Sequence, residues 1–332
     1  MPLDGCEGQG CRGFDPFAAA SSPPPERVLM KSTVGVLIPM YNGADFIHQA
    51  LASVAAQSRP VDQVVVIDDC SIDDSLMRVK EWSDRLPLTV IEFTTNSGVS
   101  EARNAGLAAL NTDLVALLDA DDVWLPDHVE LSVKAHETCG GIISAGAFIW
   151  YPGGALRPYN KHLRLEVPPP HRQLGALLER NFVFVSSMVE LSELHAVGGF
   201  RPDTIEDWDL WVRLVARGLT VTQIERATVL YRRHPGNASR RRSVIIEQEI
   251  QLLLCFRREL PARFSSVIDR SLRHRRSELL VARHLEDGDF SGRRLPLSLM
   301  GQALRGDWRS RLKASALWAA PGMANRMHKD RS

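Results

Sequence analysis

The chain has 332 residues, of which 44% are hydrophobic and 24% charged, a composition typical of a soluble globular protein with one large or two smaller domains. Its 40 basic and 40 acidic residues give a formal net charge of zero, which argues against a nucleic-acid partner bound mainly through phosphate charge. The five cysteines lack a paired short spacing, so they offer neither a disulfide framework nor a zinc site. No signal segment or apolar run of the roughly 20 residues needed to span a bilayer is visible, so we expect a cytoplasmic protein.

The elements predicted in chain order alternate between short apolar strands and amphipathic helices. Such alternation is typical of an α/β fold, in which a mostly parallel sheet is covered by helices on both faces. We expect Pro39 to end the first strand. The predicted strands are 34–38, 64–67, 88–93, 115–118, 142–150, 182–189 and 221–231, and the predicted helices are 45–57, 73–82, 100–110, 174–180 and 206–216.

Composition divides the chain into three parts. Residues 1–30 are rich in Gly, Ser, Ala and Pro and are predicted to be a disordered leader. Residues 31–240 carry the α/β pattern, and residues 241–332 are predicted to be a helical, Arg-rich extension. Within that extension, residues 295–323 mix apolar and basic side chains. Three interpretations stay open for this stretch: a peripheral contact with an anionic membrane, a helical cap packed on the main domain, or a dimer contact.

An acidic turn follows the predicted strand 115–118. Asp119, Asp121 and Asp122 stand where the apolar run stops, at the edge where open α/β sheets bind ligands. Carboxylates suit Mg²⁺ or Mn²⁺, and these metals are usually shared with substrate phosphates. Three unpaired acids also repel one another, so the cluster is costly without a cation or a basic partner. The turn therefore predicts a metal-bridged phosphate.

Five motifs in register carry a resemblance to a known family. They are VLIPMYN at 36–42, VIDDCS at 66–71, NSGVS with ARNAG at 96–106, DADD at 119–122 and EDWD at 206–209. The chain resembles family 2 glycosyltransferases, which have a GT-A fold, from about residue 34 to residue 240. The resemblance implies a nucleotide-binding half at 31–125 and an acceptor-binding half at 126–240.

The resemblance also implies an inverting, metal-dependent transfer of a sugar from a nucleotide diphosphate donor, usually a UDP-sugar, to a hydroxyl acceptor of a surface polysaccharide, a lipopolysaccharide or another glycan. Asp207 would be the base that removes the acceptor proton, and Glu206 would orient the acceptor or be the base itself. A divalent cation, Mn²⁺ or Mg²⁺, would be bound directly by Asp121, while Asp119 would contact ribose or a metal-bound water. His234 would complete the metal site or contact the diphosphate. The residues implied for nucleotide-sugar binding are Pro39, Tyr41, Asn42, Asp69, Arg103 and Asp119.

Other interpretations remain for the same residues. Residues 68–71 and 206–207 are of types that cap helices or occupy their first turn. A phosphatase with an Asp-x-Asp nucleophile would carry that motif on its first strand, not its fourth. A dehydrogenase is disfavoured because Gly-x-Gly-x-x-Gly is absent after the first strand. A non-catalytic scaffold that binds nucleotide-sugars remains the main alternative function.

Overall fold

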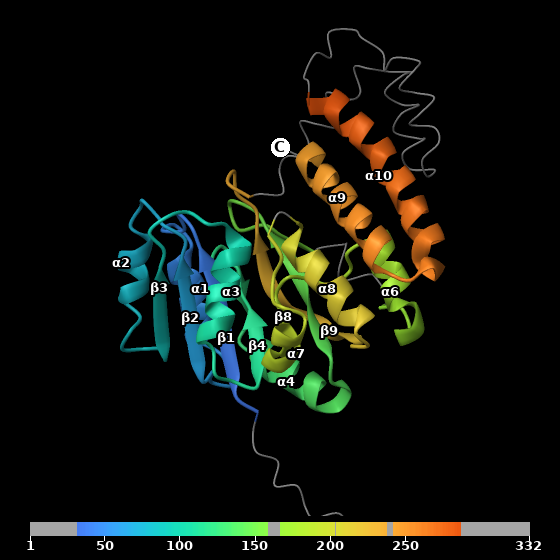
Figure 1. Ribbon diagram of the computed structural model, residues 1–332. Helices are drawn as coiled ribbons and strands as arrows, with labels where there is room; N and C mark the ends of the chain where they lie inside the picture. The colour runs from blue at the N-terminus through green and yellow to red at the C-terminus, as the bar shows by residue number, and fades with distance from the viewer. Residues whose placement is uncertain (1–31, 159–166, 203, 238–241, 287–332) are drawn as a thin grey trace, which may run out of the picture. The chain divides into compact units, whose positions relative to one another are not determined.

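The computed structural model describes residues 32–158, 167–202, 204–237 and 242–286. Within them, four strands form the parallel half of a sheet in the order β3-β2-β1-β4. Their bounds are β1 Val34–Met40, β2 Gln63–Asp68, β3 Leu88–Glu92 and β4 Leu114–Leu117. The expected α/β class and the parallel arrangement of this half are therefore confirmed (Figure 1).

The second half of the sheet is mixed. β8 (Ser187–Glu190) lies antiparallel to β4 and to β6 (Ile142–Trp150), and β6 lies parallel to β9 (Val221–Arg232). β5 (Val123–Trp124) pairs with β9 at the end of this order, and β7 (Leu156–Pro158) pairs with β6. The chain thus leaves β4 and rejoins the sheet at β5, with β8, β6 and β9 between the two. The acidic turn is the link between β4 and β5.

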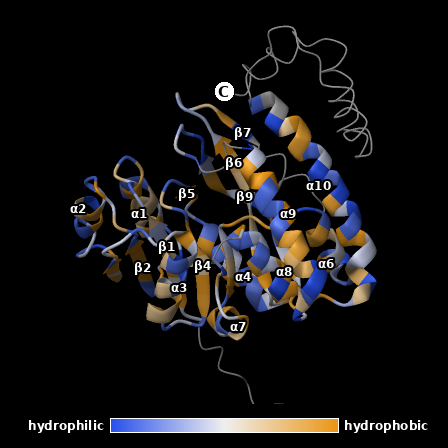
Figure 2. Cartoon of the chain, turned by 45° about the horizontal axis from the view of Figure 1, so that its top comes forward, coloured by the Kyte–Doolittle hydropathy of each residue, from blue (hydrophilic) through white to orange (hydrophobic). Residues whose placement is uncertain are grey.

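Alternating side chains of the central strands enter two separate apolar cores, as the period of two in a strand requires. Val36 and Ile38 of β1 lie in the core beneath α1 (Ile47–Ala55). Leu37 lies in the other core, beneath α3 (Val99–Ala109). α2 (Ser75–Lys80) and α4 (His128–Cys139) complete the cover of the first core. Strands buried on both faces are mostly hydrophobic, as the orange colouring of β2 and β4 in Figure 2 shows.

Two predicted strand limits are wrong. β1 continues through Pro39, which pairs in register with Ile67. The carbonyl of Leu37 accepts a hydrogen bond from the chain just after β4, so the backbone groups of Leu37 face β4. The backbone of Pro39, two residues later, faces the same side. The pairing of β1 with β4 has ended there, so the N–H that proline lacks has no partner to lose. The strand predicted over 182–189 is reduced to β8, because residues 182–186 form a buried connection held by side-chain bonds, such as the Phe184 N–H to Ser144 Oγ at 3.0 Å.

Helices from distant parts of the sequence pack on the second half. α6 (Pro170–Glu179), α8 (Glu206–Ala216), α9 (Arg242–Glu259) and α10 (Ser265–Glu286) share the core beneath α3, with α7 (Leu191–Ala196) beside β8. A short 3-10 turn, Ala262–Phe264, joins α9 to α10, and these two helices lie side by side (Figure 1). None of the described helices is long and apolar enough to cross a membrane. The predicted leader 1–30 and the stretch 295–323 lie outside the described residues.

Candidate active site

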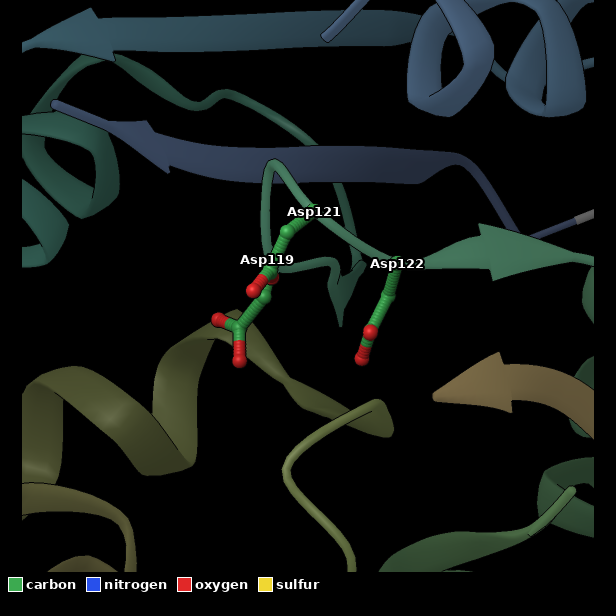
Figure 3. Close-up of side chains that lie close together, drawn as sticks. All are labelled: Asp119, Asp121 and Asp122. Atoms are coloured by element: carbon green, nitrogen blue, oxygen red, sulfur yellow. The ribbon is translucent and has the colours of Figure 1, made fainter. Parts of the chain in front are cut away.

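The acidic turn after β4 gathers three carboxylates. Oxygen atoms of Asp119, Asp121 and Asp122 all lie within 4.8 Å of one another. Their side chains project from the turn in the same general direction (Figure 3). Each oxygen that is not already bonded to a basic or amide group is a hard ligand suited to Mg²⁺ or Mn²⁺.

Arg103 joins this turn to the start of α8. Its Nη2 lies 2.7 Å from Asp119 Oδ1, and its Nη1 lies 2.6 Å from Glu206 Oε1. The guanidinium is buried, at 2% exposure, and lies over the Phe200 ring. Burial alone would lower the pKa of Arg103. The charges of Asp119 and Glu206 outweigh this effect, so the pKa is raised above its usual value. Arg103 therefore stays charged and fixes two of the site's acids.

Burial and neighbouring acids act on the turn itself. Burial raises the pKa of Asp119, partly opposed by Arg103. Asp122 is fully buried; its Oδ1 accepts the Arg232 N–H at 3.0 Å, while its Oδ2 has no hydrogen-bond partner among the described residues. Burial, followed by the charges of Asp121 and Asp119, raises the pKa of Asp122 well above its usual value. A buried carboxylate oxygen without a partner is what a cation site requires. The residues present thus fit a divalent cation.

Residues at the end of β9 and just after it contact the acidic turn. His234 Nε2 lies 2.9 Å from Asp121 Oδ2, and the Asn237 amide donates to the same oxygen at 3.3 Å. The Gly236 N–H donates to His234 Nδ1, which favours the tautomer with its proton on Nε2, facing Asp121. Arg232 Nε donates to the Asp121 carbonyl at 2.8 Å. The predicted metal residues Asp119, Asp121 and His234 are therefore brought together.

Asp207 occupies the first turn of α8, beside Glu206. It is half-buried; its Oδ1 accepts the Trp208 N–H at 2.7 Å, and its Oδ2 accepts the Asn181 side-chain amide at 3.1 Å. Burial, with the charge of Glu206, raises the pKa of Asp207 to about 7, although Arg103 opposes the shift. A carboxyl group with a pKa near neutrality can exchange a proton under physiological conditions.

Hydrogen bonds join the loop after β1 to the loop after β2. Asn42 Oδ1 accepts the Ile72 N–H at 2.9 Å, and the Asn42 N–H donates to Ser71 Oγ at 2.9 Å. Asn42 and Cys70 have positive φ angles of 49° and 65°, the region that tight turns of non-glycine residues reach with strain. The Tyr41 ring stands beside this junction, 52% exposed. These loops form one border of the sheet edge at which the parallel strands have their carboxyl ends.

Asp69 holds the neighbouring loop that leads into α3, a structural role that its motif did not indicate. Its two carboxylate oxygens accept the N–H groups of Ser97 and Gly98, at 2.7 and 2.8 Å, and thereby hold the loop that enters α3. It does not cap α2, the helix that directly follows it in the sequence. Asp69 and Pro39 lie with Tyr41 and Asn42 at the ends of β1 and β2, so four of the six residues predicted to bind the nucleotide-sugar form one group on the sheet edge. The other two, Arg103 and Asp119, pair with each other at the acidic turn.

Sequence reasoning missed three residues that complete the site. Asp122 was recognised as part of the acidic turn but received no role. Asn237 follows His234 in the turn HPGN, whose Pro and Gly were the available signal. Asn181 had no signal, because it belongs to a connection that we expected to be a strand. Each of the three contacts a site residue that lies far from it in the sequence.

The chain is similar to known glycosyltransferases in both sequence and fold. Residues 35–192 match the model of the family described as Glycosyl transferase family 2. The amylovoran biosynthesis glycosyltransferase AmsE of Erwinia amylovora is 26% identical over 222 residues, covering 65% of this chain and 83% of AmsE. A structure of Staphylococcus aureus TarS 1–349 in complex with UDP-GlcNAc superposes with a TM-score of 0.59 at 16% identity, covering 89% of this chain and 92% of that one.

A second structural neighbour is the mannosyltransferase PcManGT of Pyrobaculum calidifontis in complex with GDP-Man and Mn²⁺. Its TM-score is 0.57 at 21% identity, covering 90% of this chain and 88% of that one. Likeness at these identities establishes the fold, which is GT-A. The sequence matches then specify it further: residues 35–192 match the glycosyltransferase family 2 model, and relatives that share about two thirds of this chain are named glycosyltransferases, so the chain is a glycosyltransferase that carries a family 2 domain.

Proposed function

We propose that this enzyme inverts the anomeric centre of a sugar as it transfers that sugar from a nucleotide diphosphate donor to a hydroxyl group of a growing surface polysaccharide. The observation that carries the proposal is the chain of contacts Asp119–Arg103–Glu206, which ties the acidic turn to the helix that presents Asp207. Diphosphate-binding and proton-accepting groups then border one reaction space. The relatives support the process, because AmsE is named for amylovoran biosynthesis.

Asp207 is our candidate for the base. Its pKa of about 7 lets it be ionised at neutral pH and still accept a proton. The acceptor hydroxyl would give its proton to Asp207, its oxygen would bond to the anomeric carbon, and the bond from that carbon to the diphosphate would break. One displacement of this kind inverts the carbon and needs one base. Glu206, paired with Arg103, is better suited to orienting the acceptor than to taking the proton.

Asp121 and Asp122, with His234 and the second carboxylate oxygen of Asp119, are the proposed cation ligands. A divalent cation bound there would stabilise the charge that develops on the departing diphosphate. His234 Nε2 would have to lose the hydrogen that faces Asp121 before it could bind a metal, so in the absence of metal we assign it the role of orienting Asp121. PcManGT, which was solved with GDP-Man and Mn²⁺, provides the supporting precedent in the same fold.

The donor nucleotide is assigned to residues 31–125 and the acceptor to 126–240. Tyr41 offers an exposed ring for a base, and Asp69, Asn42 and Pro39 shape the loops around it. We favour a uridine diphosphate donor because TarS, which shares the fold, was solved with UDP-GlcNAc. The cytoplasmic face of the membrane is the proposed place of action, since lipid-linked acceptors are found there.

The test is a thermal-shift titration with UDP, GDP and their sugars, with and without Mn²⁺. A ligand that binds only the folded state raises the Tm, by an amount that depends on its concentration relative to Kd. We expect a Mn²⁺-dependent rise with one nucleotide and its loss in D121N, whereas D62N outside the site should keep it. The same donors are then tested for release of the nucleoside diphosphate by wild type and D207N.

Three outcomes separate the parts of the proposal. A nucleotide shift in the absence of metal that Mn²⁺ does not change would contradict the metal role. Release of nucleoside diphosphate by D207N at the wild-type rate would contradict the base assignment. No shift and no release with any nucleotide-sugar would overturn the donor class.

A further inference from the structure

Asn181 meets Asp207 with a fixed orientation of its amide. Asn181 Oδ1 accepts the Val183 N–H at 3.1 Å, so the NH₂ end must face the other way. That end donates to Asp207 Oδ2 at 3.1 Å. Because the backbone fixes which end of the amide is the donor, Asp207 meets a donor and not an acceptor.

The C-terminal hairpin α9–α10 holds the segment that carries Asn181. Arg275 of α10 is buried, at 7% exposure, and its Nη2 donates to the carbonyl of Glu179 at 3.0 Å, two residues before Asn181. Its guanidinium also lies over the Trp208 ring, 5.7 Å from the centroid. Ion pairs with Glu249 of α9 and Glu278 of α10 fix Arg275 in turn.

Trp208 closes this set of contacts. It follows Asp207 directly in α8, and its Nε1 donates to the carbonyl of Leu177 in α6 at 2.8 Å. The end of α6, the start of α8 and the face of α10 are therefore tied together at the residues adjoining Asp207. Figure 1 shows α6 and α8 beside the α9–α10 pair. Arg275, Trp208 and Asp207 lie beyond the stretch 35–192 that matches the family model, whereas Asn181 lies within it.

We propose that Asn181 is a positioning residue for Asp207 and that the α9–α10 hairpin, through Arg275, holds Asn181 and Trp208 in place around it. This inference rests on the proposed role of Asp207 as base. A donor on Oδ2 favours the ionised form, which keeps Asp207 available as a base at neutral pH, and it fixes the direction of the remaining lone pairs toward the acceptor hydroxyl. The hairpin is then a part of the catalytic apparatus and not an appended domain.

The sharpest variant is N181D, because it keeps the shape and the acceptor for the Val183 N–H but replaces the donor with a second carboxylate. The charged groups with the largest effect on Asp207 are Glu206, Arg103 and Asp119, so the new charge adds to an already acidic neighbourhood. N111D, at an exposed position, is the matched control, and R275M is compared with R276M at an exposed position of the same helix.

The first measurement needs no activity. A double-mutant cycle of Tm at pH 8 is built from wild type, N181D, D207N and N181D/D207N. N181D is expected to lower the Tm of the wild type by about 2–4 °C, and to leave the Tm of D207N unchanged or raise it. The reason is that the double variant exchanges the two groups: the amide introduced at position 207 can donate to the carboxylate introduced at position 181. Equal effects of N181D in both backgrounds would overturn the contact.

The second measurement is steady-state transfer with the donor that the wild type uses. N181D and R275M are expected to lower kcat about tenfold or more with the donor KM changed less than about twofold, and N181D to shift the acid limb of the kcat profile to higher pH. N111D and R276M should match the wild type. If D207N is inactive while N181D keeps the wild-type kcat and pH profile, the positioning role is wrong. If the wild type transfers nothing from any donor, the proposed function fails, and the catalytic role of Asn181 fails with it.

Discussion

Arg103 of α3 and Glu206 of α8 form an ion pair at 2.6 Å although 103 residues separate them in the sequence. The same guanidinium reaches Asp119, so one buried cation sets the distance between the acidic turn and the helix that presents Asp207. Motif reading placed Arg103 near the nucleotide, but its burial and its two partners make it the link between the two halves of the site.

R103M should therefore affect both stability and catalysis. Removing the cation deprives Asp119 and Glu206 of their shared partner, and breaking a buried pair costs about 3–5 kcal/mol. We expect unfolding by urea to show a loss of at least about 2 kcal/mol, a smaller figure because both acids keep some contact with solvent. R85M removes an exposed arginine and is the control. Unchanged stability of R103M would contradict the structural role.

The raised pKa of Asp207 predicts how stability depends on pH. An acid whose pKa is about 7 in the folded state and near 4 when unfolded binds its proton more tightly in the folded state. Its contribution to stability is present at acid pH and is lost as the pH rises from about 4 to about 7. D207N abolishes that loss, so we expect the Tm of D207N relative to that of wild type to be higher at pH 8 than at about pH 4.5. A Tm difference that does not vary with pH would contradict the assigned pKa.

Asp122 gives a prediction about metal. Its Oδ2 is buried without a partner in the described part of the chain, and its pKa is raised well above normal by burial and by Asp121 and Asp119. D122N removes the charge but keeps the shape, so it should raise the Tm in EDTA. The same variant should lose most of the stabilisation that Mn²⁺ and nucleotide give to the wild type. If Mn²⁺ and nucleotide stabilise D122N and wild type equally, Asp122 is not a ligand.

Two adjacent glycines test the packing beneath Arg103. Gly198 and Gly199 both have positive φ, at 79° and 69°. A Cβ on Gly199 would lie 2.4 Å from Asn104 Oδ1, whereas a Cβ on Gly198 would meet no described atom within 4 Å. Asn104 holds Phe200, the ring under Arg103, through two hydrogen bonds of 2.8 Å.

Both alanine variants carry the same backbone strain of about 1–2 kcal/mol, and only G199A adds the clash. We expect G199A to lower the free energy of unfolding by about 1–3 kcal/mol more than G198A does. Chemical denaturation measures both, and nucleoside diphosphate release should fall in G199A more than in G198A. Equal destabilisation of the two variants would show that Asn104 moves aside freely.

The sequence alone determined the local features of this enzyme. Apolar runs, either alternating with polar residues or continuous, predicted the positions of the strands. The helical period predicted α1, α3 and α8. Both patterns follow from backbone geometry within a single element. The acids at the ends of strands predicted the edge that is expected to bind ligands, and the order of five motifs carried the resemblance to the family whose model matches residues 35–192. The predicted ends of strands were wrong where contacts with another element determine the strand end, as at Pro39 and at residues 182–186.

Only the tertiary structure decided which side chains meet. The curl that carries the chain from β4 to β5 brings the end of β9, with Arg232 and His234, against Asp121 and Asp122. The packing of α6, α8 and α10 brings Asn181 and Arg275 to Asp207, and none of these pairs has a fixed spacing in the sequence. The pKa of Asp207 follows from that assembly, because burial and the charges of Glu206 and Arg103 act only once the elements are packed.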